Sequence, residues 1–241
     1  MPNRHMRGCL TDANYEGLDI LMEVYSNQIR RAWVIFFACL FSVMGSVLFV
    51  DRPASTWAHE HLHRAAVFDW LTHIVDPLRP AATIILVFVA IAAVFRNWRP
   101  GKHGQTLIAA SLAILVSVEI KQQMKHFCGR TWPETWIDNN PSWIRDHAYG
   151  FHLLHGGTGW ESFPSGHMTQ IAALAAIIWL RLPKLRWLGV ALASLVAIGL
   201  WGCNYHFVGD LMAGAFLGAF CGIGVSALIC PVREVDEPLP S

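Results

Sequence analysis

The residues with the clearest chemical potential lie in one short stretch, Ser162–Met168, which reads SFPSGHM. A Pro-Ser-Gly-His sequence between a glycine-rich segment and an apolar run is typical of a helix start, with Ser165 as the N-cap. Free N–H groups at a helix N-terminus suit a phosphate, and Gly166 lets a ligand approach the backbone closely. His167 falls in the first turn and can carry a proton. The stretch therefore predicts an anion-binding helix N-terminus beside an acid–base group.

A histidine and a carboxylate four residues apart, His206 and Asp210, form the second chemical feature. Residues with this spacing share a face of a helix. The carboxylate can then accept the Nδ1–H of the imidazole, which fixes the tautomer and leaves Nε2 free. We predict that Asp210 orients His206 in this way.

Two basic residues, Lys125 and Arg130, lie at the end of a long apolar run and complete the set. Phosphoryl transfer needs cations and N–H donors around the phosphate, an in-line nucleophile and an acid for the leaving group. The predicted phosphate-binding residues are Lys125, Arg130, Ser165 and Gly166. His206 is the predicted nucleophile, and His167 is the predicted acid. All three stretches must meet on one side of a membrane for this chemistry to occur.

The elements that position these residues are predicted to be membrane helices. The chain is 54% hydrophobic and 15% charged, with a mean hydropathy of +0.38, whereas soluble domains average roughly 25% charged residues. A bilayer span needs roughly 17–25 helical residues. The expected fold class is all-α, a polytopic membrane protein with six transmembrane helices plus interfacial N-terminal helices. The six apolar runs are Ala32–Val50, Ala81–Phe95, Thr106–Phe127, Ser165–Leu182, Trp187–Cys203 and Val208–Cys230.

Interfacial segments and loops flank the predicted membrane domain of residues 32–230. Residues 1–31 are expected to be cytoplasmic or interfacial, with an amphipathic helix at Tyr15–Ile29. Residues 57–75 are expected to form a second interfacial helix, and residues 231–241 a cytoplasmic tail. Pro80 limits how far the second apolar run extends backwards, so the start of that span stays open.

Lys and Arg in the connecting segments predict the orientation. They concentrate before residue 32 and in the links at 96–102 and 181–186, so these regions and both termini are expected to be cytoplasmic. The long loop 128–164 and the candidate site then face the opposite side. The loop carries three histidines without a tight ligand pattern, so we expect no metal site. The net charge of +1 offers no support for nucleic acid binding.

Together these motifs resemble the type 2 phosphatidic acid phosphatase (PAP2) superfamily of integral membrane lipid phosphatases. That family has three signatures: a Lys followed after six residues by Arg-Pro, then Pro-Ser-Gly-His, then Ser-Arg, five residues, His, three residues and Asp. Here Pro164–His167 keep the second signature, His206 and Asp210 keep the end of the third, and Lys125 with Pro133 keeps the frame of the first.

The resemblance implies an enzyme that forms a phosphohistidine on His206 and needs neither metal nor cofactor. Asp210 would orient His206, and His167 would protonate the departing oxygen and then activate water. The implied partners are a phosphorylated lipid substrate and the bilayer, with no nucleic acid. The resemblance also suggests a bacterial inner membrane, with the active site on the extracytoplasmic side.

Two positions depart from the family pattern. Trp132 stands where Arg precedes Pro133, and Leu200 stands where the third signature has Arg. Arg130 is the nearest substitute for the first, and Lys121 or Arg145 are further candidates.

Three functions stay open. A lipid phosphatase would act on phosphatidic acid, phosphatidylglycerol phosphate, a polyprenyl diphosphate or a lipid A phosphate. A phosphotransferase would pass the phosphate to an acceptor alcohol. A non-catalytic lipid-binding or transport relative is favoured by the two missing arginines. A disulfide between Cys128 and Cys203 is also open, because both are expected near the site.

Overall fold

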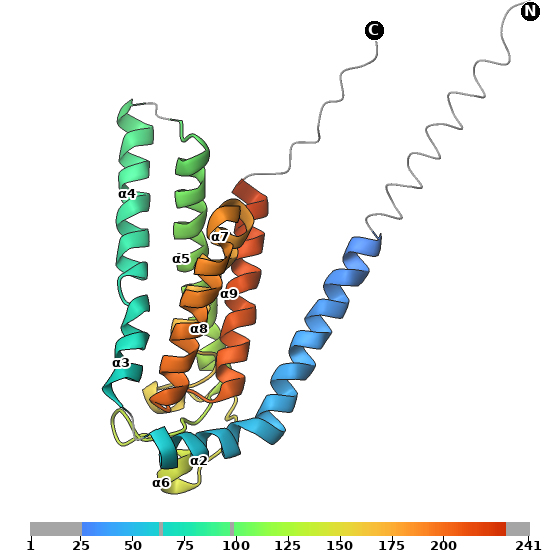
Figure 1. Ribbon diagram of the computed structural model, residues 1–241, viewed down its shortest axis with the longest axis vertical. Coiled ribbons are helices and arrows are strands. Elements are labelled where there is room, and N and C mark those ends of the chain that lie inside the picture. Colours follow the sequence, from blue (N-terminus) through green and yellow to red (C-terminus); the bar gives the residue numbers. More distant parts are fainter. Residues whose placement is uncertain (1–25, 63–64, 97–98, 230–241) are drawn as a thin grey trace, which may run out of the picture. The chain divides into compact units, whose positions relative to one another are not determined.

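The computed structural model describes residues 26–62, 65–96 and 99–229, whose named elements are all helices (Figure 1), with three isolated β-bridges among residues 130–161. The chain falls into two compact units, residues 1–42 and 43–241, and every candidate site residue lies in the second. After a helix at 26–45, the elements are η1 Ser46–Val50, α2 Asp51–Leu62, α3 Ala66–Thr72, η2 His73–Val75, α4 Leu78–Arg96, α5 Lys102–Cys128, α6 Trp143–Asp146, η3 Thr158–Trp160, α7 Gly166–Arg181, η4 Pro183–Leu185, α8 Arg186–Gly202 and α9 Val208–Ile229.

Five helical stretches of the described chain are long and apolar enough to cross a membrane. The all-α polytopic membrane fold predicted from the sequence is confirmed. The stretches are Ser26–Leu62, Ala66–Arg96, Lys102–Cys128, Pro183–Gly202 and Val208–Ile229. Residues 15–25 of the predicted amphipathic helix and the tail at 231–241 lie outside the described residues.

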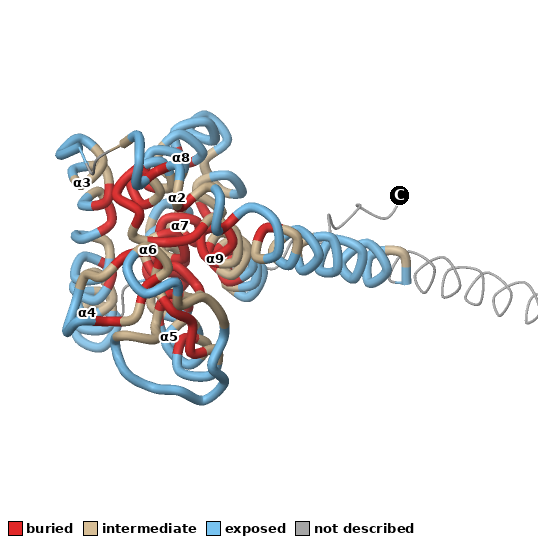
Figure 2. Tube along the Cα trace, turned by 90° about the horizontal axis from the view of Figure 1, so that it is seen from below, coloured by how far each residue is buried: buried red, intermediate tan, exposed pale blue. Residues whose placement is uncertain are grey.

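The fourth predicted span forms α7, which has 16 residues and so falls short of the roughly 17–25 residues that cross a bilayer. It packs against α5, α8 and α9, and Figure 2 shows buried chain where these helices meet. Ile171, Ala173 and Ile177 are almost completely buried. The apolar run therefore reflects a core position inside the bundle as well as a membrane environment.

Residues 57–75 do not form the single interfacial helix that was predicted. Instead α3 and η2 lead into α4, and the whole stretch Ala66–Arg96 is apolar enough to span. Helix α3 packs closely on α8, where a β-carbon at Gly199 or Gly202 would collide with Phe68 or its neighbours. Pro80 lies in the first turn of α4, where its missing N–H costs no helical hydrogen bond, so the helix begins before it.

A row of glycines on α9 brings α7 and α9 into close contact. β-Carbons added at Gly214, Gly218 and Gly222 would lie 2.1–2.7 Å from backbone oxygens of α7. Small residues at four-residue spacing let membrane helices approach closely, since packing rather than water exclusion drives their association. This contact holds the start of α7 against the start of α9.

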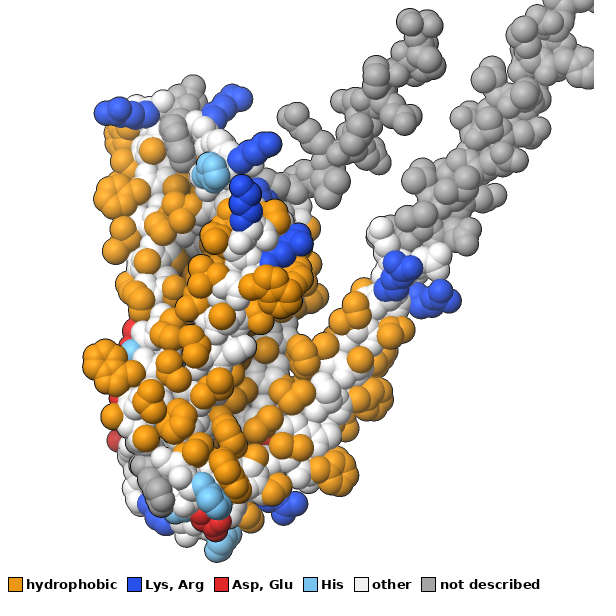
Figure 3. Space-filling model, viewed as in Figure 1, with side chains coloured by type: hydrophobic (Ala, Val, Ile, Leu, Met, Phe, Trp, Pro, Cys, Tyr) orange, Lys and Arg blue, Asp and Glu red, His pale blue; other side chains and the backbone are white. Residues whose placement is uncertain are grey.

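Apolar side chains cover the sides of the bundle, as Figure 3 shows. On α4 they include Phe88, Val94 and Phe95, which are more than half exposed and suit contact with lipid tails. Basic side chains gather at the end of the bundle where α4 and α7 end (Figure 3), including Arg96 and Arg181. The loop between α5 and α7 lies at the opposite end (Figure 1).

Candidate active site

The N-terminus of α7 has the capped geometry that the sequence predicted. Ser165 is the N-cap with extended backbone angles, and its hydroxyl accepts a hydrogen bond from the Met168 N–H. The Ser165 N–H donates to the carbonyl oxygen of Asp210 at 3.1 Å. This bond ties the Pro-Ser-Gly-His stretch directly to the first turn of α9.

Two lysines one turn apart on α5 lie near this helix start. A β-carbon at Gly166 would lie 3.3 Å from the Nζ atom of Lys121, so the ammonium group lies against the N-terminal turn of α7. Lys125 is 8% exposed, and its Nζ lies 5.4 Å from the centroid of the Trp132 ring. Because α5 ends at Gly129, which has a left-handed conformation, the chain turns into the loop just after these lysines.

Trp132 links Lys125 to His206. Its ring centroid lies 5.2 Å from that of His206, and its indole N–H donates to the carbonyl oxygen of Thr158 at 2.9 Å. The residue that replaces the family's arginine therefore forms a wall of the site between the lysine and the imidazole. Leu200, at the other departing position, belongs to the apolar core beside Val196 and Met168.

His206 lies in the connection between α8 and α9 and not on a helix as predicted. It is 4% exposed. Its Nδ1 lies 3.6 Å from Oδ2 of Asp210, which is the range of an ion pair and too long for a direct hydrogen bond. Burial lowers the pKa of His206, although Asp210 acts in the opposite direction. The ring is therefore neutral near pH 7.

Asp210 connects three parts of the site. Its carboxylate accepts hydrogen bonds from the Ser162 hydroxyl at 2.6 Å and from the Phe207 N–H at 3.0 Å. It also accepts from a guanidinium nitrogen of Arg130. The carboxylate is completely buried, so its position is determined by these donors.

Arg130 occupies a different place from the phosphate-binding position that the sequence suggested. Its side chain is completely buried between two carboxylates, Asp210 and Asp51, and one terminal nitrogen lies 2.5 Å from Asp51 Oδ2. Burial lowers the pKa of Arg130, but the two carboxylates outweigh this effect and raise it. A guanidinium with both terminal nitrogens engaged and no exposed surface has no free face for a phosphate.

Asp51, which the sequence analysis did not single out, anchors this buried cluster. It accepts hydrogen bonds from the Ser46 hydroxyl at 2.9 Å and from the Gly209 N–H at 2.7 Å, in addition to Arg130. Tyr149 donates to Asp51 at 3.3 Å. The sequence signal that could have identified Asp51 is a single aspartate at the end of an apolar run. Its position in the sequence gives no indication that it pairs with Arg130.

His167 lies on α7 with a side chain that is 41% exposed, and its Nε2 is 3.7 Å from Oδ1 of Asp76. The charges of His206, Lys121 and Lys125 all act on it. The predicted residues His167, His206, Lys125, Ser165 and Gly166 thus share one region of the molecule.

The remaining candidates lie elsewhere. Arg145 is engaged with Asp146 and Asn139 on the loop surface. No disulfide joins Cys128 to Cys203 in the described structure. Within residues 26–62, 65–96 and 99–229, no three His, Cys, Asp or Glu side chains converge as metal ligands.

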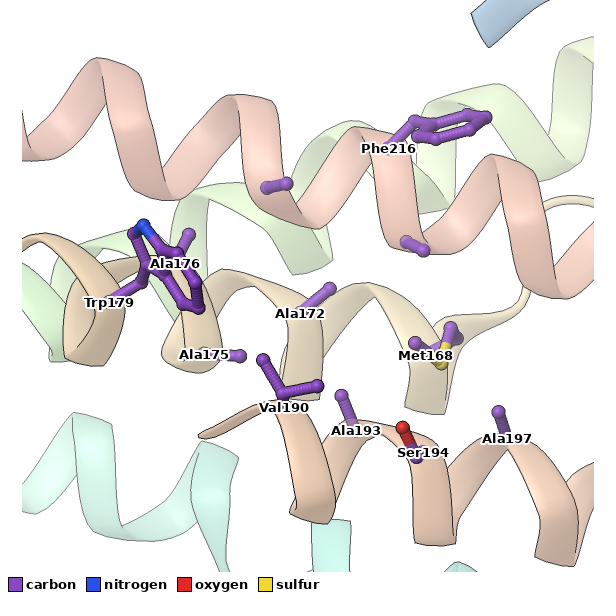
Figure 4. A pocket seen from close by; sticks show the side chains of 12 residues that line it. Met168, Ala172, Ala175, Ala176, Trp179, Val190, Ala193, Ser194, Ala197 and Phe216 are labelled. Carbon is purple, nitrogen blue, oxygen red and sulfur yellow. The ribbon is translucent and has the colours of Figure 1, made fainter. Parts of the chain in front are cut away.

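A groove of about 420 Å³ lies among α7, α8 and α9 (Figure 4). Figure 4 shows Met168 and Trp179 at its two ends, with small side chains such as Ala172 and Ala193 between them. Ser194 is the one polar residue of its lining. The groove therefore offers no group that would hold a phosphate, and the candidate site lies outside it.

Comparison with known proteins supports the same region. The family model described as PAP2 superfamily matches residues 106–230. This range includes His167, His206, Lys121 and Lys125. A search of curated protein sequences found no match. Among solved structures, the fold is similar to a transmembrane PAP2 type phosphatidylglycerolphosphate phosphatase from Bacillus subtilis, with a TM-score of 0.54 and 21% identity over 81% of this chain and 94% of that one.

Proposed function

Because the chain belongs to the PAP2 superfamily, we propose that it is an integral membrane lipid phosphatase that removes a terminal phosphate from a lipid head group through a phosphohistidine. The observation that carries this proposal is the convergence of His206, Lys125 and the N-terminus of α7, joined through Trp132 and the bond between Ser165 and Asp210. The site lies where helices of the membrane bundle end, which suits a substrate held in the bilayer.

Four groups hold the phosphate in this proposal: the ammonium groups of Lys121 and Lys125 and the helix start at Ser165 and Gly166. Lys121 takes the place of the missing motif arginine because its Nζ lies against Gly166. The two ammonium groups, the Ser165 hydroxyl and the Gly166 N–H stabilise the charge that develops on the equatorial oxygens, since the Ser165 N–H is engaged with Asp210. Arg130 contributes indirectly by holding Asp210.

The first step uses His206 as the nucleophile. Its neutral Nε2 forms a bond to phosphorus while the bond from phosphorus to the lipid oxygen breaks, and His167 gives its proton to that oxygen. Asp210, 3.6 Å from Nδ1, stabilises the positive charge that the ring acquires. In the second step His167 takes a proton from water, the water oxygen bonds to phosphorus, and the bond to Nε2 breaks.

The substrate classes that fit are phosphatidic acid, phosphatidylglycerol phosphate, a polyprenyl diphosphate and a lipid A phosphate. We place the protein in a bacterial inner membrane with its termini in the cytoplasm and its site on the extracytoplasmic side. The basic residues at the end of the bundle opposite the site support this orientation.

The test is phosphate release from a panel of these four lipids by the full chain in detergent without added divalent metal. We expect release from at least one lipid, and loss of release in His206→Ala and His167→Ala. His103→Ala is the matched control, because His103 is exposed at the start of α5. Retained activity in both site variants would refute the assignment.

Trapping with radiolabelled substrate separates the phosphatase from its alternatives. Acid-labile label on wild-type protein but not on His206→Ala supports the phosphohistidine. Label that passes to an added alcohol instead of water would indicate a phosphotransferase. A protein that binds lipid but is never itself labelled would favour a non-catalytic relative. Trp132 in place of an arginine supports that hypothesis.

A further inference from the structure

The candidate site contains a second histidine–aspartate pair, His167 with Asp76, in addition to His206 with Asp210. Asp76 belongs to the turn between η2 and α4, and its Oδ1 lies 3.7 Å from Nε2 of His167. The two residues are 91 positions apart in the chain and meet because η2 packs against α7. Neither the Pro-Ser-Gly-His motif nor the spacing of the other motifs indicates this contact.

Asp76 is itself held by a second imidazole. Its other oxygen, Oδ2, lies 2.6 Å from Nδ1 of His73, and Nε2 of His73 lies 3.4 Å from Asp69. The Tyr205 hydroxyl donates to the opposite oxygen of Asp69 at 3.0 Å. Carboxylates and imidazoles therefore alternate from His167 to a tyrosine that directly precedes His206 in the sequence.

The charges around His167 explain why it needs such a partner. Burial opposes a positive charge on its ring most strongly, and His206, Lys125 and Lys121 add to this effect, whereas Asp76 favours the charge; together they lower the pKa of His167 to about 4. A general acid must carry a proton before it can give it to the leaving oxygen. The two lysines that bind phosphate therefore disfavour the protonated form of the site's own acid, and Asp76 is the group that opposes this effect.

We propose that Asp76 is a positioning residue whose carboxylate favours the protonated form of His167 that a general acid needs, and that His73 fixes Asp76. This inference rests on the proposed phosphatase function. With Nε2 facing Asp76, the Nδ1 of His167 gives its proton to the lipid oxygen and later accepts one from water. The proton returns to His167 within each turnover, so no external donor is needed.

The test compares two leaving groups with Asp76→Asn in the full purified chain. An alkoxide leaving from phosphatidic acid needs a proton, whereas nitrophenolate leaving from p-nitrophenyl phosphate does not. We expect kcat on phosphatidic acid to fall on the order of 10–10²-fold, part of the range that general acid catalysis supplies. KM stays within about twofold, and kcat on the aryl ester changes less than about threefold, because no phosphate-binding group is altered.

Two further variants serve as controls. Asp76→Glu keeps the charge and retains most of the lipid activity, whereas Glu60→Gln makes the same chemical change at an exposed position of α2 and has no effect. Because the Asp76 side chain is 55% exposed, its replacement leaves no buried group unpaired and the protein folds.

The outcomes separate the two proposals. The inference alone is overturned if Asp76→Asn hydrolyses phosphatidic acid at the wild-type rate, or if its kcat falls equally on phosphatidic acid and on p-nitrophenyl phosphate. A wild-type protein that releases phosphate from no substrate overturns the proposed function and the inference with it.

Discussion

Removing the Asp51 carboxylate should destabilise the protein strongly, because it is the anchor of a cluster with no access to water. Asp51→Ala leaves the Ser46 hydroxyl and the Gly209 N–H without their acceptor, and the guanidinium nitrogen of Arg130 that faces Asp51 keeps only the Tyr149 hydroxyl. Asp210 still pairs with Arg130, so the buried charge keeps one partner.

The magnitude follows from these contacts. Breaking a buried ion pair by removing one partner costs about 3–5 kcal/mol. The remaining partner, Asp210, places the loss at the lower end of that range, and the orphaned Gly209 N–H adds about 1–3 kcal/mol. We therefore expect a loss of roughly 4 kcal/mol in the free energy of unfolding. For a chain of this size this corresponds to a fall of about 8–16 °C in Tm.

The assay is thermal unfolding of purified protein in one detergent, followed by intrinsic tryptophan fluorescence. Glu60→Ala is the control, because Glu60 is exposed on α2, and its Tm should stay within about 2 °C of wild type. A Tm of Asp51→Ala within 2 °C of wild type would refute the reasoning that the cluster holds the site together.

Three further predictions concern packing, pH and phosphate binding. Gly218→Val should prevent stable folding in a detergent thermal-shift assay, because its β-carbon would lie 2.1 Å from a backbone oxygen of α7, whereas Gly224→Ala meets nothing within 4 Å and should be neutral. The activity kcat/KM should fall on the acid side with an apparent pKa below the usual histidine value of about 6.5. The reason is that the neutral form of His206 attacks and that burial lowers its pKa. An apparent pKa above 7 on the acid side would contradict this. Lys121→Met should reduce kcat/KM on the order of 10²–10³-fold, like loss of one oxyanion donor, while Lys184→Met, at the opposite end of α7, should leave kcat/KM unchanged.

Much of the fold was accessible from the sequence, because hydropathy and helix capping are local properties. The runs at 106–127, 187–203 and 208–230 agree with α5, α8 and α9 to within four residues. Ser165 was predicted as an N-cap from its neighbours alone, and the structure confirms it. The short length of α7 was not predicted, because a helix in the core of a bundle and a helix in contact with lipid both have apolar sequences.

The candidate site was accessible only in part. The types and spacing of His167, His206 and Asp210 predicted phosphoryl transfer only in combination with the basic residues and the helix start that could bind a phosphate. Arg130 was assigned to the phosphate because its charge was known and its burial was not. Its partner Asp51 lies 79 residues earlier, and no local sequence pattern predicts which carboxylate will pair with the guanidinium of Arg130.

The sequence by itself therefore determined the membrane class, most helix limits and the chemical groups that are present. Only the tertiary structure decided which groups meet. The packing of α5 against α7 brings Lys121 to Gly166, and the packing of η2 against α7 brings Asp76 to His167. The physical reason is that charge and hydropathy belong to single residues, whereas burial and pairing arise only when distant helices pack together.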